Sequence, residues 1–252
     1  MPAGATHVMR FHVLTLFPSM FDSPFAESIV ARARNEGLID IEVHDIREHS
    51  DGPHRSVDDY AFGGGPGMVM KPEPIFKAAE AVRSSSSFAE DSPVVLLSPK
   101  GRRLTQRVVE ELSEHKELML ICGRYEGVDE RVRQHLATDE ISIGDFVLSG
   151  GEIAAMVVID SVSRLLPGVV GSMESTQDDS FTTGLLQFPQ YTRPAEFRGW
   201  RVPDILLSGN HGEIARWRRE ESLRATLADR PDLLDSADLS AEDRAFIQRL
   251  EE

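Results

Sequence analysis

Two glycine-bearing loops hold the residues of this chain best suited to chemistry. One covers residues 123–127, Gly-Arg-Tyr-Glu-Gly, and the other covers 143–151, Ile-Gly-Asp-Phe-Val-Leu-Ser-Gly-Gly. Each follows a short apolar run typical of a strand. Glycines at strand ends permit positive φ angles and let main-chain groups approach a bound molecule closely. Ligands bind at this place in alternating strand and helix architectures, so we expect a ligand site built mainly from backbone.

Charged side chains in or beside these loops are the candidates for the chemistry itself. Most exposed charges on a protein are only solvated surface groups, so residue type alone does not assign a role to any of them. The candidates are Arg124, Glu126, Asp129, Asp145 and Arg164, followed further along by Asp178 and Asp179.

Several common cofactor motifs are absent from the sequence. The loop at 63–67, Gly-Gly-Gly-Pro-Gly, lacks the following Lys and Ser/Thr of a P-loop, and Pro66 removes a backbone donor. No Gly-x-Gly-x-x-Gly follows a strand, which disfavours a dinucleotide. The eight histidines show no zinc-ligand spacing, so we predict no metal site. Cys122 ends an apolar run, where a small buried thiol is commoner than a nucleophile.

Composition describes an ordinary globular chain of one or two domains. It has 252 residues, 40% hydrophobic and 27% charged, and no apolar run approaches the roughly 18 residues of a bilayer span, so no membrane partner is expected. The first residues lack a secretory signal and there is one cysteine, which together predict a cytoplasmic location.

The net charge of −15 argues against a nucleic-acid partner, but the charge is uneven. Residues 229–252 hold eight carboxylates against three arginines. A local basic face can coexist with an acidic whole. Its candidate residues fall close together in the sequence: Arg198, Arg201, Arg216, Arg218 and Arg219.

The loops must be positioned by strands and helices that alternate through the first 170 residues, which predicts an α/β fold with a mainly parallel sheet. Helices are expected at 24–34, with Ser23 as N-cap, after Thr105, and at 152–166, where Pro167 stops a nearly all-apolar segment. So apolar a helix belongs in the core or against a second subunit. Strands are expected at 11–17, 39–44, 94–98, 118–122 and 141–143.

The amino-acid composition and the motifs of the chain change after residue 171. Residues 172–188 are rich in Ser, Thr, Asp and Gly, which predicts a linker or mobile loop. Asn210 with Glu213, and Ser240 with Asp243, are typical of capping boxes that open helices. We therefore expect three parts: a ligand-binding domain at 1–171, the linker at 172–188 and a small helical domain at 189–252.

Long motifs in a fixed order resemble the bacterial tRNA (guanine-N1)-methyltransferases over nearly the whole chain. Three of them are Gly-Arg-Tyr-Glu-Gly-Val-Asp-Glu-Arg from Gly123, Ser-Ile-Gly-Asp-Phe-Val-Leu-Ser-Gly-Gly-Glu from Ser142, and Asp-Ser-Val-Ser-Arg-Leu-Leu-Pro-Gly-Val from Asp160. The resemblance also takes in Leu16-Phe17-Pro18, Gly63 to Met68, Leu97-Ser98-Pro99, Asp179-Ser180-Phe181, Tyr191-Thr192-Arg193-Pro194 and Leu207-Ser208-Gly209-Asn210-His211.

The resemblance implies a SPOUT-type α/β domain with a deep trefoil knot, followed by a small C-terminal helical domain. It also implies a homodimer with the active site at the subunit interface, and S-adenosylmethionine held by three loops. The implied cofactor-binding residues are Leu96, Leu97, Ser98, Pro99, Gly123, Tyr125, Gly127, Ile143, Gly144, Asp145, Phe146, Val147, Leu148, Gly150 and Gly151.

The implied reaction is methyl transfer to N1 of the guanosine immediately 3′ of the tRNA anticodon, which aids maintenance of the reading frame. N1 carries a proton, so a general base must remove it. By resemblance that base is Asp179. Arg164 would stabilise negative charge developing at O6, and Glu126 would orient the cofactor or the base.

The resemblance also has implications for RNA contacts and for magnesium. Ser175 matches a serine of an RNA-ordered loop, and Arg216 and Arg219 would meet phosphates; the alternative is a helix with solvated arginines. Magnesium aids members of the family, but no spacing here defines a site. Gln190 and Leu96 depart from the family pattern. The open alternatives are a non-enzymatic RNA-binding protein, or a SPOUT methyltransferase acting on ribosomal RNA or a ribose hydroxyl.

Overall fold

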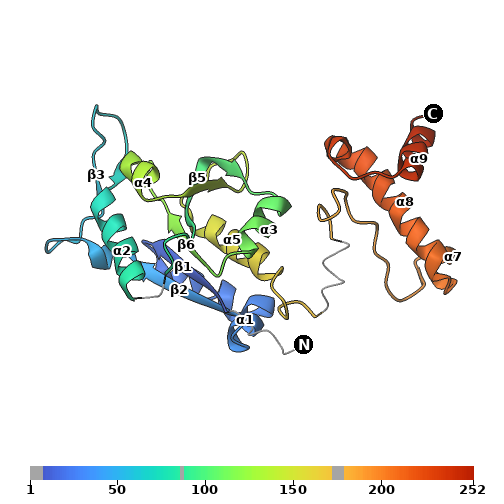
Figure 1. Ribbon diagram of the computed structural model, residues 1–252, viewed down its shortest axis with the longest axis horizontal. Helices are drawn as coiled ribbons and strands as arrows, with labels where there is room; N and C mark the ends of the chain where they lie inside the picture. Colours follow the sequence, from blue (N-terminus) through green and yellow to red (C-terminus); the bar gives the residue numbers. More distant parts are fainter. Residues whose placement is uncertain (1–7, 86–87, 172–178) are drawn as a thin grey trace. The chain divides into compact units, whose positions relative to one another are not determined.

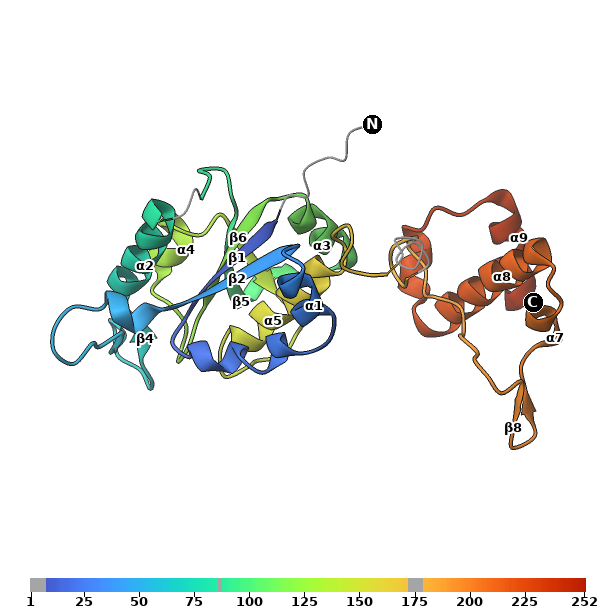
Figure 2. The same cartoon turned by 90° about the horizontal axis from the view of Figure 1, so that it is seen from below.

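The computed structural model describes residues 8–85, 88–171 and 179–252 (Figures 1 and 2). It divides into two compact units, residues 1–171 and residues 172–252.

The first unit is built on a parallel five-stranded sheet, which confirms the predicted α/β fold. Its order is β2-β1-β6-β5-β7, and every neighbouring pair is parallel. All residues of the central strand β6 are buried, because both faces of the sheet are covered and such strands are continuous apolar runs. The strands are β1 (Met9–Thr15), β2 (Ile39–Asp45), β5 (Val94–Arg103), β6 (Glu117–Cys122) and β7 (Asp139–Ser142).

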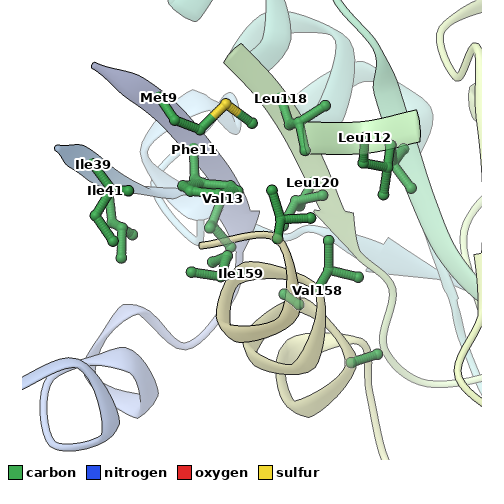
Figure 3. Close-up of a cluster of buried hydrophobic side chains, with 14 of the residues drawn as sticks. Met9, Phe11, Val13, Ile39, Ile41, Leu112, Leu118, Leu120, Val158 and Ile159 are labelled. Atoms are coloured by element: carbon green, nitrogen blue, oxygen red, sulfur yellow. The ribbon is translucent and has the colours of Figure 1, made fainter. Parts of the chain in front are cut away.

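Helices cover both faces of this sheet (Figures 1 and 2). Apolar side chains of α1 (Ser28–Asn35), α3 (Gln106–Ser113) and α5 (Glu152–Ser163) share one core with the sheet. Figure 3 shows Val158 and Ile159 of α5 packed beside Phe11, Val13 and Leu120 in this core.

The opposite face has its own core, filled by α2 (Pro72–Ser85) and α4 (Glu130–His135). The helix α2 was not predicted, although Pro72 and Pro74 lie in its first turn, where proline is tolerated. A short antiparallel pair, β3 (Asp58–Asp59) and β4 (Val69–Met70), frames the glycine-rich loop at 63–67. The single turn η3 (Ile46–His49) follows β2.

The helix expected over 24–34 is wrong as a single element. The chain instead forms the turns η1 (Pro18–Phe21) and η2 (Pro24–Ala26) before α1 begins. Extended backbone at Glu27 and a φ of 60° at Ser28 break the helical path, and Ser23 makes no capping hydrogen bond. The break has a packing reason, because Phe25 is buried with its ring 5.8 Å from that of Phe21.

The start of α3 follows its predicted signal, whereas the end of α5 does not. The Thr105 hydroxyl accepts a hydrogen bond from the Val108 backbone and opens α3. The α5 helix ends at Ser163 rather than at 166, because its last turn tightens: the Leu166 N–H donates to the Ser163 carbonyl at 3.2 Å.

The second unit is largely helical. It contains α7 (Asp204–Leu207), α8 (His211–Asp229), the turn η4 (Pro231–Asp235) and α9 (Ala241–Glu251). Asn210 caps α8 through the Glu213 backbone, and Ser240 with Asp243 forms a complete capping box on α9, as the sequence predicted. A hairpin of β8 (Glu196–Phe197) and β9 (Trp200–Arg201) turns through Arg198 and Gly199, both at positive φ.

Part of the predicted linker falls in this unit. Its described residues, 179–188, contain neither helix nor strand, yet they pack against the helices. Leu185 is buried, and the Leu186 N–H donates to the Thr226 hydroxyl of α8 at 2.9 Å. No helix among the described residues of either unit is long and apolar enough to cross a membrane.

Candidate functional site

A cavity of about 330 Å³ lies beyond the ends of β6 and β7 and beside the irregular part of β5 between Leu97 and Arg102. The two glycine loops and this part of β5 form its walls, and Glu126 also lines it. Most of the predicted cofactor-binding residues are brought together here, namely Leu96, Leu97, Ser98, Pro99, Gly123, Tyr125, Gly127, Ile143, Gly144, Phe146, Val147, Leu148, Gly150 and Gly151.

Asp145 is the predicted cofactor residue that the cavity lining does not include. Its side chain is 84% exposed and pairs with the Arg103 guanidinium. The loop at 143–151 turns Gly144 and Phe146 inward, and Asp145 between them faces the surrounding water.

Other lining residues were not predicted. Part of the lining comes from β7 itself, whose Ile141 pairs with Leu97 on β5, and pairing between strands distant in sequence leaves no local sequence signal. Arg133 lies one helical turn after Glu130 and pairs with it, which neutralises both charges beside the cavity. Arg124 and Ser149 lie in the two predicted loops, and the residues missed are Lys100, Val128, Glu130, Arg133, Glu140, Ile141, Ser142 and Ala154.

The two glycine loops touch each other through their backbones. The Gly151 N–H donates to the Gly123 carbonyl at 2.9 Å, and Arg124 and Gly150 form a β-bridge. A Cβ atom at Gly151 would lie 2.8 Å from the Cα of Cys122, closer than real Cβ contacts allow. The close approach therefore requires glycine at this position.

A buried charge pair fastens the loops to α5 and β1. Arg124 Nε lies 2.9 Å from Glu152 Oε2, and the Glu152 side chain is 1% exposed. The two atoms meet as an ion pair rather than as an aligned hydrogen bond. The Thr15 hydroxyl donates to Glu152 Oε1 at 2.8 Å, while Arg124 donates to the Ser149 carbonyl at 3.1 Å and its guanidinium lies 4.5 Å from the centre of the Phe17 ring.

Glu126 is held against the glycine-rich loop at 63–67. Its N–H donates to the Met68 carbonyl at 3.0 Å, and a methyl group at Gly67 would collide with its carboxylate. The preceding Tyr125 has a φ of 62°, a conformation costly for a side chain with a Cβ and common at functional sites. The glycine-rich segment thus positions a cavity residue.

Cys122 lies under the cavity but is not a nucleophile. It is completely buried at the end of β6, and this burial, reinforced by the nearby Glu152, raises the pKa of its thiol well above the ordinary value. Because the thiolate is the reactive form, the structure supports the interpretation of Cys122 as core.

Two of the residues predicted to act on the substrate, Arg164 and Asp179, lie in different units. Arg164 caps the C-terminus of α5 in the first unit and is exposed. Asp179 is half-buried in the second unit, where its carbonyl accepts a hydrogen bond from Thr182. Neither belongs to the cavity lining. Ser175 lies outside the described residues.

The predicted RNA-binding arginines of α8 differ in their surroundings. Arg216 is 67% exposed and makes a surface pair with Glu213 at 3.2 Å. Arg219 is clamped by Asp243, with Nε to Oδ1 at 3.1 Å and a terminal nitrogen to Oδ2 at 2.9 Å. That clamp lowers the pKa of Asp243 to about 2, chiefly through the Arg219 hydrogen bonds. Arg219 therefore joins α8 to α9, whereas Arg216 faces solvent.

A parallel α/β sheet with a backbone-lined cavity at the carboxyl ends of its strands defines a class of protein that binds a small cofactor in that place. A family model described as tRNA (Guanine-1)-methyltransferase TrmD matches residues 9–236. The chain belongs to this family.

Curated relatives of nearly the same length share more than half of their residues with it. A protein of Dehalococcoides mccartyi strain BAV1 is 57% identical over 242 residues, covering 96% of this chain and 97% of the relative. Proteins of Geobacillus kaustophilus and Dictyoglomus turgidum are 56% and 52% identical over 243 residues, covering 96% of this chain and 98% and 97% of those relatives. All three are named tRNA (guanine-N(1)-)-methyltransferase.

Proposed function

We propose that this chain transfers a methyl group from S-adenosylmethionine to N1 of the guanosine immediately 3′ of the anticodon in tRNA. The observation that carries the proposal is the cavity formed by the family's own motifs at the ends of β6 and β7 and at the irregular part of β5. Near-full-length identity to proteins named for this activity supports it.

The residues of the cavity fit S-adenosylmethionine. Its volume of about 330 Å³ lies within the range of small-molecule sites, roughly 300–1,000 Å³. Apolar groups such as Leu96 and Leu148 suit an adenine ring, and the carboxylates of Glu126 and Glu140 suit a ligand that carries positive charge. When bound, S-adenosylmethionine supplies an electrophilic methyl group on its sulfonium.

Asp179 is proposed to accept the proton of guanosine N1. As that proton leaves, the nitrogen pair forms the new bond to the methyl carbon while the carbon–sulfur bond breaks. Negative charge moves toward O6, where the Arg164 guanidinium would stabilise it. Glu126, fixed by Met68 and Gly67, would keep the reacting groups in line.

Charge and aromatic groups of the second unit support an RNA-binding role. Phe197 and Trp200 of the β8–β9 hairpin are 56% and 70% exposed, and the Arg198 guanidinium lies 5.1 Å from the centre of the Phe197 ring. Exposed aromatic rings and arginines stack on unpaired bases. Together with Arg216 they would offer the anticodon loop both stacking and phosphate contacts.

We propose a homodimer with the active site at the interface, Mg²⁺ as an aid to RNA binding or catalysis, and a cytoplasmic location. The trefoil knot and the division into a catalytic domain, a linker and a tRNA-binding domain stay predictions as well.

One assay tests the proposed reaction. The full chain is incubated with tritiated S-adenosylmethionine and unmodified tRNA transcripts that carry guanosine or adenosine beside the anticodon, with and without Mg²⁺. Digestion should yield labelled 1-methylguanosine from the guanosine transcript alone. Label on a ribose would identify a different SPOUT activity, and no label would favour a non-enzymatic RNA-binding protein.

A further inference from the structure

A cluster of possible metal ligands lies on β1 and β2, away from the cofactor cavity. His12 is directly opposite Glu42 in the parallel register of the two strands, and His44 lies two residues after Glu42, on the same face of β2. None of the three residues lines the cavity.

The three side chains converge on one point. His12 Nδ1 lies 3.2 Å from His44 Nε2 and 3.6 Å from Glu42 Oε2, and His44 Nε2 lies 3.8 Å from the same oxygen. Two ligands of a tetrahedral zinc ion with bonds of about 2.1 Å are separated by about 3.4 Å. The three observed separations between ligand atoms are therefore close to the separation expected in such a coordination shell.

The three side chains of the cluster differ in their exposure to solvent. The His12 side chain is 0% exposed, that of His44 is 23% and that of Glu42 is 44%. This gradient leaves one side open for a water ligand and for entry of an ion, while His12 anchors the site in the core. Burial lowers the pKa of both imidazoles, which favours the neutral form that binds metals.

The simpler alternative is one N–H···N hydrogen bond between the two imidazoles. It pairs only His12 Nδ1 with His44 Nε2. It also gives no role to the Glu42 carboxylate, which both ring nitrogens face within 4 Å.

We propose that His12, Glu42 and His44 bind a transition-metal dication, Zn²⁺ in the first place, with water as the fourth ligand. Two imidazoles and one carboxylate form a donor set that zinc accepts, whereas Mg²⁺ prefers all-oxygen sites. The ion would tie the edge strand β2 to β1.

The test is calorimetric titration of the full, chelator-treated protein with ZnCl₂, and separately with MgCl₂. Zinc should bind with a stoichiometry of one per chain and raise the melting temperature, and Co²⁺ should give the visible absorption of a tetrahedral site. Replacement of one ligand, by His44→Gln or by Glu42→Gln at the more exposed position, should weaken zinc binding at least about tenfold. The matched control is His115→Gln, an exposed histidine elsewhere in the first unit, which should bind as the wild type does.

Three results would overturn the site: no zinc uptake, unchanged uptake by both ligand variants, or a loss in the control equal to that in the variants. Because the measurement is metal binding and not methyl transfer, its failure leaves the proposed function untouched. Glu42→Gln keeps the test valid if His44→Gln fails to fold.

Discussion

Arg124 and Glu152 are the residues on which the geometry of the cavity depends most. Their pair is almost completely buried, and Arg124 continues from it to the Ser149 carbonyl of the opposite loop. Separating the two side chains would leave a buried charge without its partner, which is costly. The pair therefore holds the two glycine loops in a fixed relative position.

Glu152→Gln should destabilise the protein strongly. The change leaves the Arg124 guanidinium buried beside a neutral amide, so we expect the free energy of unfolding to fall by about 3 kcal/mol or more. Urea denaturation measures this. The control Glu73→Gln removes an exposed carboxylate, 63% exposed and paired with Lys77, and should change the free energy of unfolding far less, because solvent screens such surface pairs. Equal losses in the two variants would contradict the role given to the buried pair.

Asp179→Asn should separate chemistry from cofactor binding. The amide is nearly the same size but cannot accept the N1 proton, so the methyl-transfer rate should fall by about 10²- to 10⁴-fold. Calorimetric affinity for S-adenosylmethionine should stay unchanged, because the cavity lining does not include Asp179. Asp91→Asn, an exposed carboxylate of the first unit, is the control. Full activity of Asp179→Asn would remove this residue from the mechanism.

At the scale of elements, the sequence predicted those segments whose signal is local. The strand β6 is apolar from Leu118 to Cys122 because it is covered on both faces, and α9 opens with a capping box that four residues define. Non-local features were not predictable in this way. His12 and His44 are 32 residues apart and meet only because β1 and β2 pair in parallel, and Asp145 turns outward through the local path of its loop.

The Arg219 clamp on Asp243, helped by the capping box of α9, should make stability depend on pH in the acid range. The pKa of Asp243 is about 2 in the folded protein and 3.8 in the unfolded chain. A lowered pKa stabilises the fold above about pH 4, and the contribution is lost as the pH falls from about 4 to about 2. Asp243→Asn should therefore be less stable than the wild type at pH 6 but lose less stability on acidification, as measured by thermal unfolding. Parallel pH profiles would contradict the assignment.

The two arginines of α8 should respond differently to substitution. Arg216→Gln removes an exposed charge, so tRNA affinity should fall and the slope of log K against log salt should shrink by about 1, with unchanged stability. Arg219→Gln breaks the clamp on Asp243 and should lower the melting temperature. Arg249→Gln, an exposed charge on α9, is the control for binding. If the salt dependence of tRNA binding by Arg216→Gln equals that of the wild type, the alternative is favoured, in which the arginines of α8 are solvated and do not contact RNA.

At the scale of the whole molecule, the outer face of α5 bears on the proposed dimer. Ile153 and Val157 are 47% and 40% exposed, although this helix is otherwise among the most apolar in the chain. Residues 153, 157, 160 and 164 recur at helical spacing, so Arg164 continues the same face. A partner subunit that covers Ile153 and Val157 would then lie beside Arg164, which is the arrangement required by an active site at the interface.

Val157→Glu should convert the proposed dimer to a monomer. A carboxylate buried at an apolar subunit contact without a partner is costly, whereas on an exposed helix face it has little effect. Analytical ultracentrifugation should show half the mass of the wild type, with an unchanged far-UV circular dichroism spectrum and a loss of methyl transfer. Arg107→Glu on α3, where the side chain is 89% exposed, reverses a charge on the same unit and should stay dimeric. A dimeric Val157→Glu variant would show that the subunit contact lies elsewhere. Arg164 would then not lie beside that contact, and the proposal of an active site at the interface would lose its support from α5.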